Sequence, residues 1–122
     1  MKKLIILIAL FLIAPFAFAE TVTVYNYQTG QYETYDVQRS GNQSTIYDYG
    51  RGAFIDGTHN NGQSTYFDYG TGSFSDVQRV APNQYQEYDY GTGSFRDYTV
   101  NPGGSVDVYD YGTGTYSTYD IE

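Results

Sequence analysis

Short stretches of aromatic and β-branched residues alternate with polar residues along most of the chain, and each stretch meets a glycine-containing tip. One six-residue pattern, aromatic-Asp-Tyr-Gly-Thr-Gly in its most regular form, recurs every 21 residues or so, at 25–30, 47–52, 67–72, 88–93 and 109–114. A further aromatic residue follows each copy by two positions. After residue 19 nothing has helical periodicity, so the pattern predicts five β-hairpins.

The hairpin tips are predicted near residues 28–30, 50–52, 70–72, 91–93 and 112–114. The first tip glycine is replaced by Gln28 in the first copy. The second tip glycine is present in all five copies, as Gly30, Gly52, Gly72, Gly93 and Gly114. A three-residue loop, in which a type I turn is closed by a left-handed residue, needs a positive φ only at its third position. We therefore expect these five glycines to be the structural turn residues.

This loop sets a register in which Tyr27 lies opposite Gln31 and Asn26 lies opposite Tyr32. Because side chains alternate along a strand, Asn26 and Tyr32 then share one face of the hairpin. The other face is expected to carry Tyr25, Tyr27 and Tyr35. Both faces are therefore aromatic, and we expect both to be partly covered.

Two arrangements of the hairpins are open, a closed ring and a stacked cross-β ladder. In an in-register ladder the acids at one motif position would lie about 4.8 Å apart. Each neighbouring Asp pair would then cost on the order of 1 kcal/mol even in water. The positions concerned are Asn26, Asp48, Asp68, Asp89 and Asp110. A ring separates these side chains, and we favour it.

Five hairpins of the form aromatic-Asp-Tyr-Gly-x-Gly-x-aromatic, behind an apolar leader, resemble the five-fold β-flower proteins of bacteria. The resemblance covers residues 22–122, and the first repeat departs from the pattern at Asn26 and Gln28. It implies an all-β fold in which five hairpins surround a five-fold pseudo-axis as a shallow closed barrel. It also implies an apolar or lipid-like ligand in a central channel, and no settled activity.

The first nineteen residues are typical of a secretory signal peptide. Lys2 and Lys3 precede an apolar run over 4–14, and Ala17-Phe18-Ala19 provides small residues before the expected cleavage site. The apolar run is shorter than the roughly 20 residues of a membrane-spanning helix. We therefore predict a signal helix over 1–19, one domain over 20–122, and a periplasmic or secreted bacterial protein with no transmembrane segment after cleavage.

The formal net charge of −8 becomes more negative if the two lysines are removed. Phosphate binding needs a basic surface, so nucleic acid is not an expected partner. Cysteine and tryptophan are absent, which excludes thiol enzymes and zinc–cysteine modules.

No catalytic constellation is evident, and the chain is predicted not to be an enzyme. His59, the single histidine, is expected in a solvated connector over 58–62. The repeated acids are expected to accept hydrogen bonds from tip N–H groups. Calcium binding by these acids is the alternative, but the motif lacks the dense acid spacing of calcium loops. We predict neither a metal nor a cofactor.

The remaining candidates for ligand binding are tyrosines that occupy one repeated position beside the tip: Tyr27, Tyr49, Tyr69, Tyr90 and Tyr111. They are either packing residues or an aromatic rim that holds an apolar ligand or stacks on sugar rings. The sequence thus favours an exported non-catalytic binding or scaffold module with an apolar or lipid-like ligand on its axis. A multivalent carbohydrate-binding protein and a fibre-forming matrix protein are the alternatives.

Overall fold

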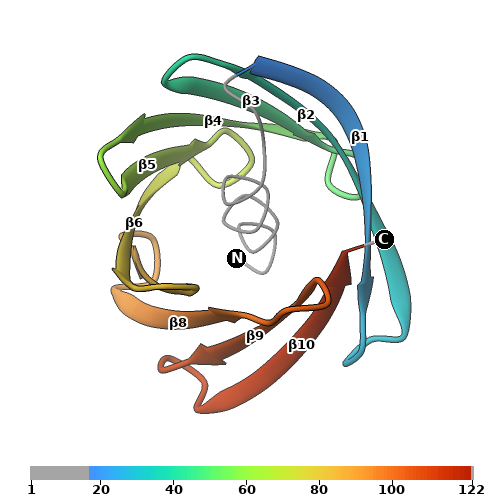
Figure 1. The fold of residues 1–122 in the computed structure, drawn as a ribbon, viewed down its shortest axis with the longest axis vertical. Coiled ribbons are helices and arrows are strands. Elements are labelled where there is room, and N and C mark those ends of the chain that lie inside the picture. The colour runs from blue at the N-terminus through green and yellow to red at the C-terminus, as the bar shows by residue number, and fades with distance from the viewer. Residues whose placement is uncertain (1–16, 122) are drawn as a thin grey trace.

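The computed structural model describes residues 17–121, which form ten antiparallel β-strands closed into a barrel (Figure 1). The strands are β1 (Ala17–Asn26), β2 (Gln31–Ser40), β3 (Gln43–Asp48), β4 (Ala53–Asn60), β5 (Gln63–Asp68), β6 (Ser73–Ala81), β7 (Gln84–Asp89), β8 (Ser94–Val100), β9 (Ser105–Asp110) and β10 (Thr115–Ile121). Consecutive strands pair, and β1 pairs with β10 to complete the barrel. The described residues contain no helix. The predicted all-β closed barrel is confirmed. The predicted signal helix over 1–19 lies outside the described residues except for 17–19, which are not helical and form the start of β1.

The invariant tip glycines adopt the predicted left-handed conformation. Their φ angles lie between 64° and 71° at Gly30, Gly52, Gly72, Gly93 and Gly114. In the first tip, the N–H of Gly30 donates to the carbonyl oxygen of Asn26 at 2.8 Å. Each of these glycines therefore closes a turn that a side chain with a Cβ would strain.

The predicted register of the hairpins is wrong by one residue. Asn26 pairs with Gln31 and Tyr25 pairs with Tyr32, so four residues separate the last paired positions. The physical reason is that the tip is a four-residue turn over 27–30, closed by the bond from the N–H of Gly30 to the carbonyl oxygen of Asn26. Tyr27 therefore lies in the turn, and its N–H donates to the carbonyl oxygen of Thr118 in the last hairpin. A shift of one residue moves side chains to the opposite face. Tyr32 therefore shares the outer face with Tyr25, and Tyr35 is buried inside the barrel.

The connectors at the other end of the barrel are shorter than expected. Only two residues separate β2 from β3, β4 from β5, and β6 from β7. Positive φ angles of 48° at Asn61 and 82° at Gly62 make the β4–β5 connection compact. Strand β4 therefore extends to Asn60, and His59 lies within this strand. The expectation that His59 occupies a solvated connector is wrong.

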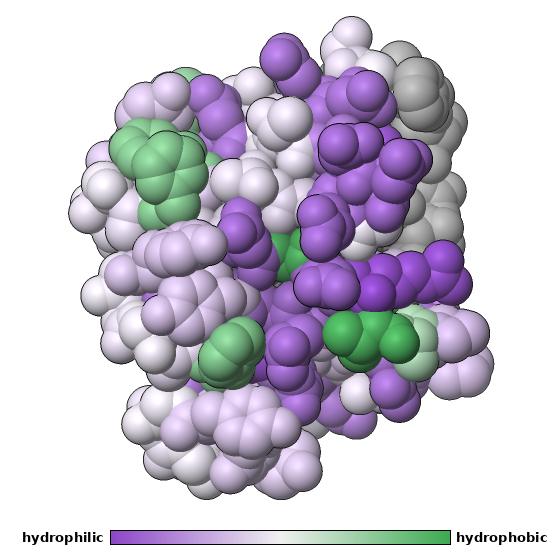
Figure 2. Space-filling model, turned by 90° about the vertical axis from the view of Figure 1, so that its left-hand side faces the viewer, coloured by the Kyte–Doolittle hydropathy of each residue, from purple (hydrophilic) through white to green (hydrophobic). Residues whose placement is uncertain are grey.

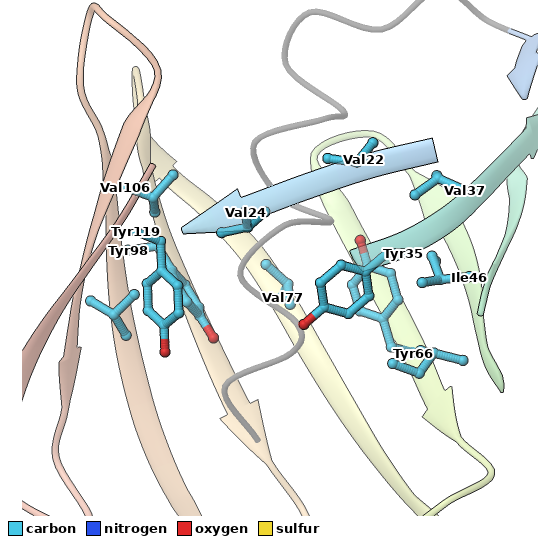
Figure 3. Close-up of a cluster of buried hydrophobic side chains, with 12 residues drawn as sticks. Val22, Val24, Tyr35, Val37, Ile46, Tyr66, Val77, Tyr98, Val106 and Tyr119 are labelled. Atoms are coloured by element: carbon cyan, nitrogen blue, oxygen red, sulfur yellow. The ribbon is translucent and has the colours of Figure 1, made fainter. Parts of the chain in front are cut away.

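The barrel interior contains aliphatic side chains together with four buried tyrosines. Val24, Val37, Ile46 and Ile55 are fully buried. The buried tyrosines are Tyr35, Tyr66, Tyr98 and Tyr119. Figure 3 shows the aliphatic side chains of β1 and β2 and the tyrosines projecting from their strands into the interior. The amphipathic tyrosines thus supply much of the volume that leucine and phenylalanine provide in other cores.

Position 57, in the barrel interior, has room only for glycine. Gly57 pairs with Tyr66 across β4 and β5. A Cβ at position 57 would lie 2.7 Å from Cε1 of Tyr66 and 2.6 Å from Oγ of Ser44. The absence of a side chain at Gly57 therefore makes room for the Tyr66 ring.

Replacing Gly57 with Ala should lower the free energy of unfolding by about 1–3 kcal/mol, because the new methyl group overpacks the core. Urea unfolding monitored by circular dichroism measures this change. Gly103→Ala is the matched control, since no atom lies within 4 Å of the new Cβ and the φ of Gly103 is not in the left-handed region. Equal stabilities of the two variants would contradict the packing of Tyr66 against Gly57.

Candidate functional site: outer grooves beside the hairpin tips

Each hairpin carries three aromatic side chains on its outer face beside the tip. In the second hairpin the ring centroid of Tyr47 lies 5.0 Å from that of Tyr49 and 4.8 Å from that of Phe54. We call each such set an aromatic triad. The other triads are Tyr25/Tyr27/Tyr32, Phe67/Tyr69/Phe74, Tyr88/Tyr90/Phe95 and Tyr109/Tyr111/Tyr116. The steep angles between the rings are those at which aromatic quadrupoles attract each other.

The five tyrosines predicted to bind ligand each belong to a different triad. Their side chains are 53% to 60% exposed, on the outside of the barrel. The structure therefore does not gather them into one axial site. Figure 2 views the side of the barrel that includes β5 and β6, and it shows separate apolar patches among hydrophilic residues. An axial ligand would meet the interior side chains instead.

Each of these tyrosines joins its own tip to the preceding hairpin. The hydroxyl of Tyr111 donates to Oδ2 of Asp97 at 2.6 Å, and its backbone N–H donates to the carbonyl oxygen of Phe95 at 3.0 Å. The corresponding hydroxyl pairs are Tyr49–Asp36, Tyr69–Asp56, Tyr90–Asp76 and, between the last and first hairpins, Tyr27–Asp120. The tyrosine hydroxyls therefore bond across each boundary between hairpins, while the ring faces stay accessible.

The hydrogen bond between Tyr49 and Asp36 shifts the pKa values of both partners, in opposite directions. The bond to Asp36 raises the pKa of the Tyr49 phenol. In turn, the hydrogen bonds from Tyr49 and Thr21 lower the pKa of Asp36. The phenols of Tyr69, Tyr90 and Tyr111 have raised pKa values for the same reason as Tyr49. At neutral pH the tyrosines are thus donors, and Asp36 is an ionised acceptor.

Three grooves lie on the outer surface beside the triads. The first, over β2 and β3, has a volume of about 300 Å³ and is lined by Asp36, Gln38 and Thr45 beside the Tyr47 triad. The second, over β6 and β7, has a volume of about 260 Å³ and combines Asp76 with Tyr88.

The third of these grooves is the largest, with a volume of about 480 Å³, and lies over β8 and β9. It contains two carboxylates, Asp97 and Asp107, beside the Tyr109 triad. We call the three together the outer grooves. Each one places aromatic rings beside carboxylate, amide and hydroxyl groups.

The repeated motif acids form a separate, inner set at the tips. Asp89 Oδ1 accepts the backbone N–H of Gly91 at 2.8 Å. The same bond, two residues along the chain, is made by Asn26, Asp48, Asp68 and Asp110. The predicted turn-stabilising role of these side chains is confirmed. No group of three or more His, Asp or Glu residues within 17–121 is arranged to hold a metal ion.

Two arginines lie between neighbouring motif acids, and neither was predicted from the sequence to do so. Arg51 bonds to Asp48 at 3.0 Å and to Asp68 at 2.8 Å. Arg96 bonds to Asp89 at 3.2 Å and to Asp110 at 3.4 Å. Since Asn26 is neutral, every charged member of the inner set is paired with an arginine. The available signal was Arg51 itself, which stands where the four other copies of the motif have threonine.

A buried ionic cluster continues from Arg96 into the barrel. Nη1 of Arg96 lies 2.7 Å from Oε1 of Glu87, which also accepts the hydroxyl hydrogen bond of Tyr98. Burial alone would lower the pKa of Arg96, but Glu87 outweighs it and the pKa is raised. Oε2 of Glu87 has no hydrogen-bond partner among the described residues. Because Glu87 is fully buried, removal of Arg96 would leave an uncompensated charge in the core.

His59 is held between two serines inside the barrel. Its Nε2 lies 3.0 Å from Oγ of Ser44, and its Nδ1 lies 2.8 Å from Oγ of Ser64. Burial, and secondarily the positive charge of Arg39, lowers the pKa of His59 to about 4. The imidazole is therefore neutral at physiological pH and acts as a hydrogen-bonded core group.

Comparisons with protein families, with curated proteins and with solved structures find no match for this chain. Within the part of the chain that the structure describes, no helical segment has the length and apolar character needed to cross a bilayer.

The low pKa of His59 makes the stability of the protein depend on pH. Below about pH 6.5 the unfolded chain binds a proton at His59, while the native state binds it only near pH 4. The free energy of unfolding should therefore fall as the pH is lowered through this window, and His59 should account for about 1–3 kcal/mol of the fall.

Chemical denaturation of wild type and His59→Gln at several pH values isolates this contribution. Gln retains polar atoms for Ser44 and Ser64 but does not titrate. The free energy of unfolding of the wild type should exceed that of the variant at pH 7, and this difference should shrink as the pH falls toward 4. A difference in stability that does not change with pH would contradict the burial of neutral His59.

Proposed function

We propose that the protein is an exported, non-catalytic binding module that holds oligosaccharides in its outer grooves. The observation that carries this proposal is the combination, in each groove, of accessible aromatic rings with carboxylate, amide and hydroxyl groups. A sugar ring has an apolar C–H face and a rim of hydroxyls. The C–H face packs on an aromatic ring, and the rim exchanges hydrogen bonds with the polar lining.

Multivalency is part of the proposal. The triads recur at all five tips, so one chain presents several similar surfaces around the barrel. Individual contacts with a sugar are weak, and linked sites gain affinity through effective concentration. We also infer a five-fold arrangement like that of the β-flower proteins, and the recurrent tyrosine–aspartate bonds support it.

The charged residues inside the barrel argue against an axial ligand site and in favour of binding in the outer grooves. The core position filled by Val24, Ile46 and Val108 in three hairpins is occupied by Glu87 in the fourth, where it forms the ionic cluster with Arg96. A channel for an apolar or lipid-like ligand would have to accommodate this charged pair.

The pairing of β1 with β10 argues against the fibre-forming alternative, because closing the sheet removes the edges on which a fibre would grow.

Export is supported by the sequence of the leader, with its two lysines, its apolar run and its small residues before position 20. An exported module without cysteine has no disulfides to stabilise it. The tyrosine-based core and the hydrogen bonds between hairpins then carry the stability of the fold.

The test is a glycan array followed by calorimetry with the purified protein. Monosaccharides should bind weakly, and multivalent glycans should bind at least about a hundredfold more tightly. A five-site variant removes the exposed second-strand aromatic residue of every triad by replacement with threonine: Tyr32, Phe54, Phe74, Phe95 and Tyr116. This variant should lose glycan binding, and Phe95→Thr alone should lose only part of the avidity.

The matched control changes exposed tip residues that lie outside the grooves, by replacing Thr29, Thr71, Thr92 and Thr113 with serine. It should bind as the wild type does, and circular dichroism establishes that both multiple variants are folded. Glycan binding that survives the five-site variant would contradict the proposal. Saturable binding of one lipid per chain, unaffected by that variant, would instead indicate an axial site.

A further inference from the structure

The outer grooves are distinguished by the sign of their charge. Asp36 and Asp76 each line one groove, and Asp97 and Asp107 line the largest groove together. Among the described residues that line these grooves, none is lysine or arginine. The whole chain has a formal net charge of −8, which adds a negative field around each groove.

The four groove carboxylates keep acceptor capacity for a ligand. Each oxygen of Asp36 accepts one hydrogen bond: Oδ1 accepts from the Thr21 hydroxyl at 2.7 Å, and Oδ2 accepts from the Tyr49 hydroxyl at 2.5 Å. Asp76 has the same arrangement with Thr65 and Tyr90, each at 2.8 Å. An ionised carboxylate offers about four lone-pair sites. About half of this capacity is therefore left to meet a donor from the groove.

Each carboxylate oxygen of Asp97 and of Asp107 also accepts one hydrogen bond. Asp97 accepts from Gln86 and Tyr111, and Asp107 accepts from Thr118 and Asn101. These bonds hold the carboxylates in place beside the aromatic rings. A cation entering this groove would meet two fixed negative charges and the faces of tyrosine rings, which also attract cations.

We propose that the outer grooves select glycans that carry free amino groups, such as polymers of glucosamine. The inference rests on the proposed function, and it names the class of sugar that the same grooves take. The ammonium group of each amino sugar pairs with a groove carboxylate, while the C–H face of the ring packs on the triad. N-acetylation removes the positive charge, and uronic acids bring a negative charge that the carboxylates repel.

The experiment compares three oligosaccharides of equal length: a glucosamine oligomer, an N-acetylglucosamine oligomer and an oligogalacturonate. Calorimetry is performed at mildly acidic pH, where the sugar amines are protonated, and Asp36 remains ionised because its pKa is lowered. The glucosamine oligomer should bind on the order of tenfold more tightly than its N-acetylated counterpart. Its affinity should fall as salt is added, since exposed charges are screened.

The variant that tests the charge replaces all four groove acids with asparagine, at positions 36, 76, 97 and 107. Asparagine keeps one of the two acceptor oxygens, which can still accept the tip tyrosine hydroxyl at positions 36, 76 and 97, so the tips stay attached. The variant should lose the preference for glucosamine and its salt dependence, and should bind the N-acetylglucosamine oligomer within about twofold of the wild type. Glu20→Gln removes one exposed charge outside the grooves and should retain the preference.

Each outcome distinguishes the inference from the proposed function. If the N-acetylglucosamine oligomer or the oligogalacturonate binds as tightly as the glucosamine oligomer, the selectivity for amino sugars is refuted while glycan binding stands. A preference that persists in the four-asparagine variant refutes the role of the groove carboxylates. If none of the three oligomers binds, the selectivity for amino sugars is refuted, and the glycan array with the five-site variant decides the proposed function.

Discussion

The fold depends on the closure between the first and last strands. β1 and β10 share only three paired positions, Val24 to Asn26 against Tyr119 to Ile121, whereas β1 and β2 pair along ten. The tip of the first hairpin strengthens this junction. The backbone N–H of Tyr27 donates to Thr118 O at 3.2 Å, and its hydroxyl donates to Asp120. Closure at this point gives the sheet an inner face, which forms the buried core, and an outer face, which carries the outer grooves.

Closure also brings the motif acids of neighbouring hairpins to one end of the barrel, where their charges oppose one another. The chain meets this constraint with a neutral residue at the first position, Asn26, and with two arginines. Arg51 joins Asp48 to Asp68, and Arg96 joins Asp89 to Asp110. The same repulsion that disfavours a stacked ladder is thus present in the barrel, and it is relieved by ion pairs specific to two of the hairpins.

The sequence predicts the closed all-β architecture because five turn signals with period-2 strands leave few alternatives, and closure is the one that removes strand edges. The left-handed glycines and the bonds from the motif acids to the tip N–H groups are also predictable, because they depend on local geometry. The register was not predicted correctly. The turn contains four residues, 27–30, where three were expected, and this shifts the pairing by one residue and exchanges the faces of Tyr32 and Tyr35.

The contacts between hairpins could not be predicted from the sequence for a different reason. The aspartate that binds a tip tyrosine stands two residues after the outer aromatic residue in the second, third and fourth hairpins, but four residues after it in the first and fifth. This change of spacing hides the recurrence in the sequence. The ion pair of Glu87 with Arg96 lies within the fourth hairpin, and it was missed because of the register: the expected register places Arg96 opposite Tyr88, whereas the structure pairs it with Glu87.

Native-state hydrogen exchange of the tip amides tests the closure most directly. The backbone N–H of Tyr27 bonds across the junction of β1 and β10, as those of Tyr49, Tyr69, Tyr90 and Tyr111 bond across the other hairpin boundaries. A closed barrel predicts that the Tyr27 amide is protected to a similar degree as the other four. Rapid exchange at Tyr27 with protection at the other four would show that the sheet is open between β1 and β10, and would contradict a closed barrel.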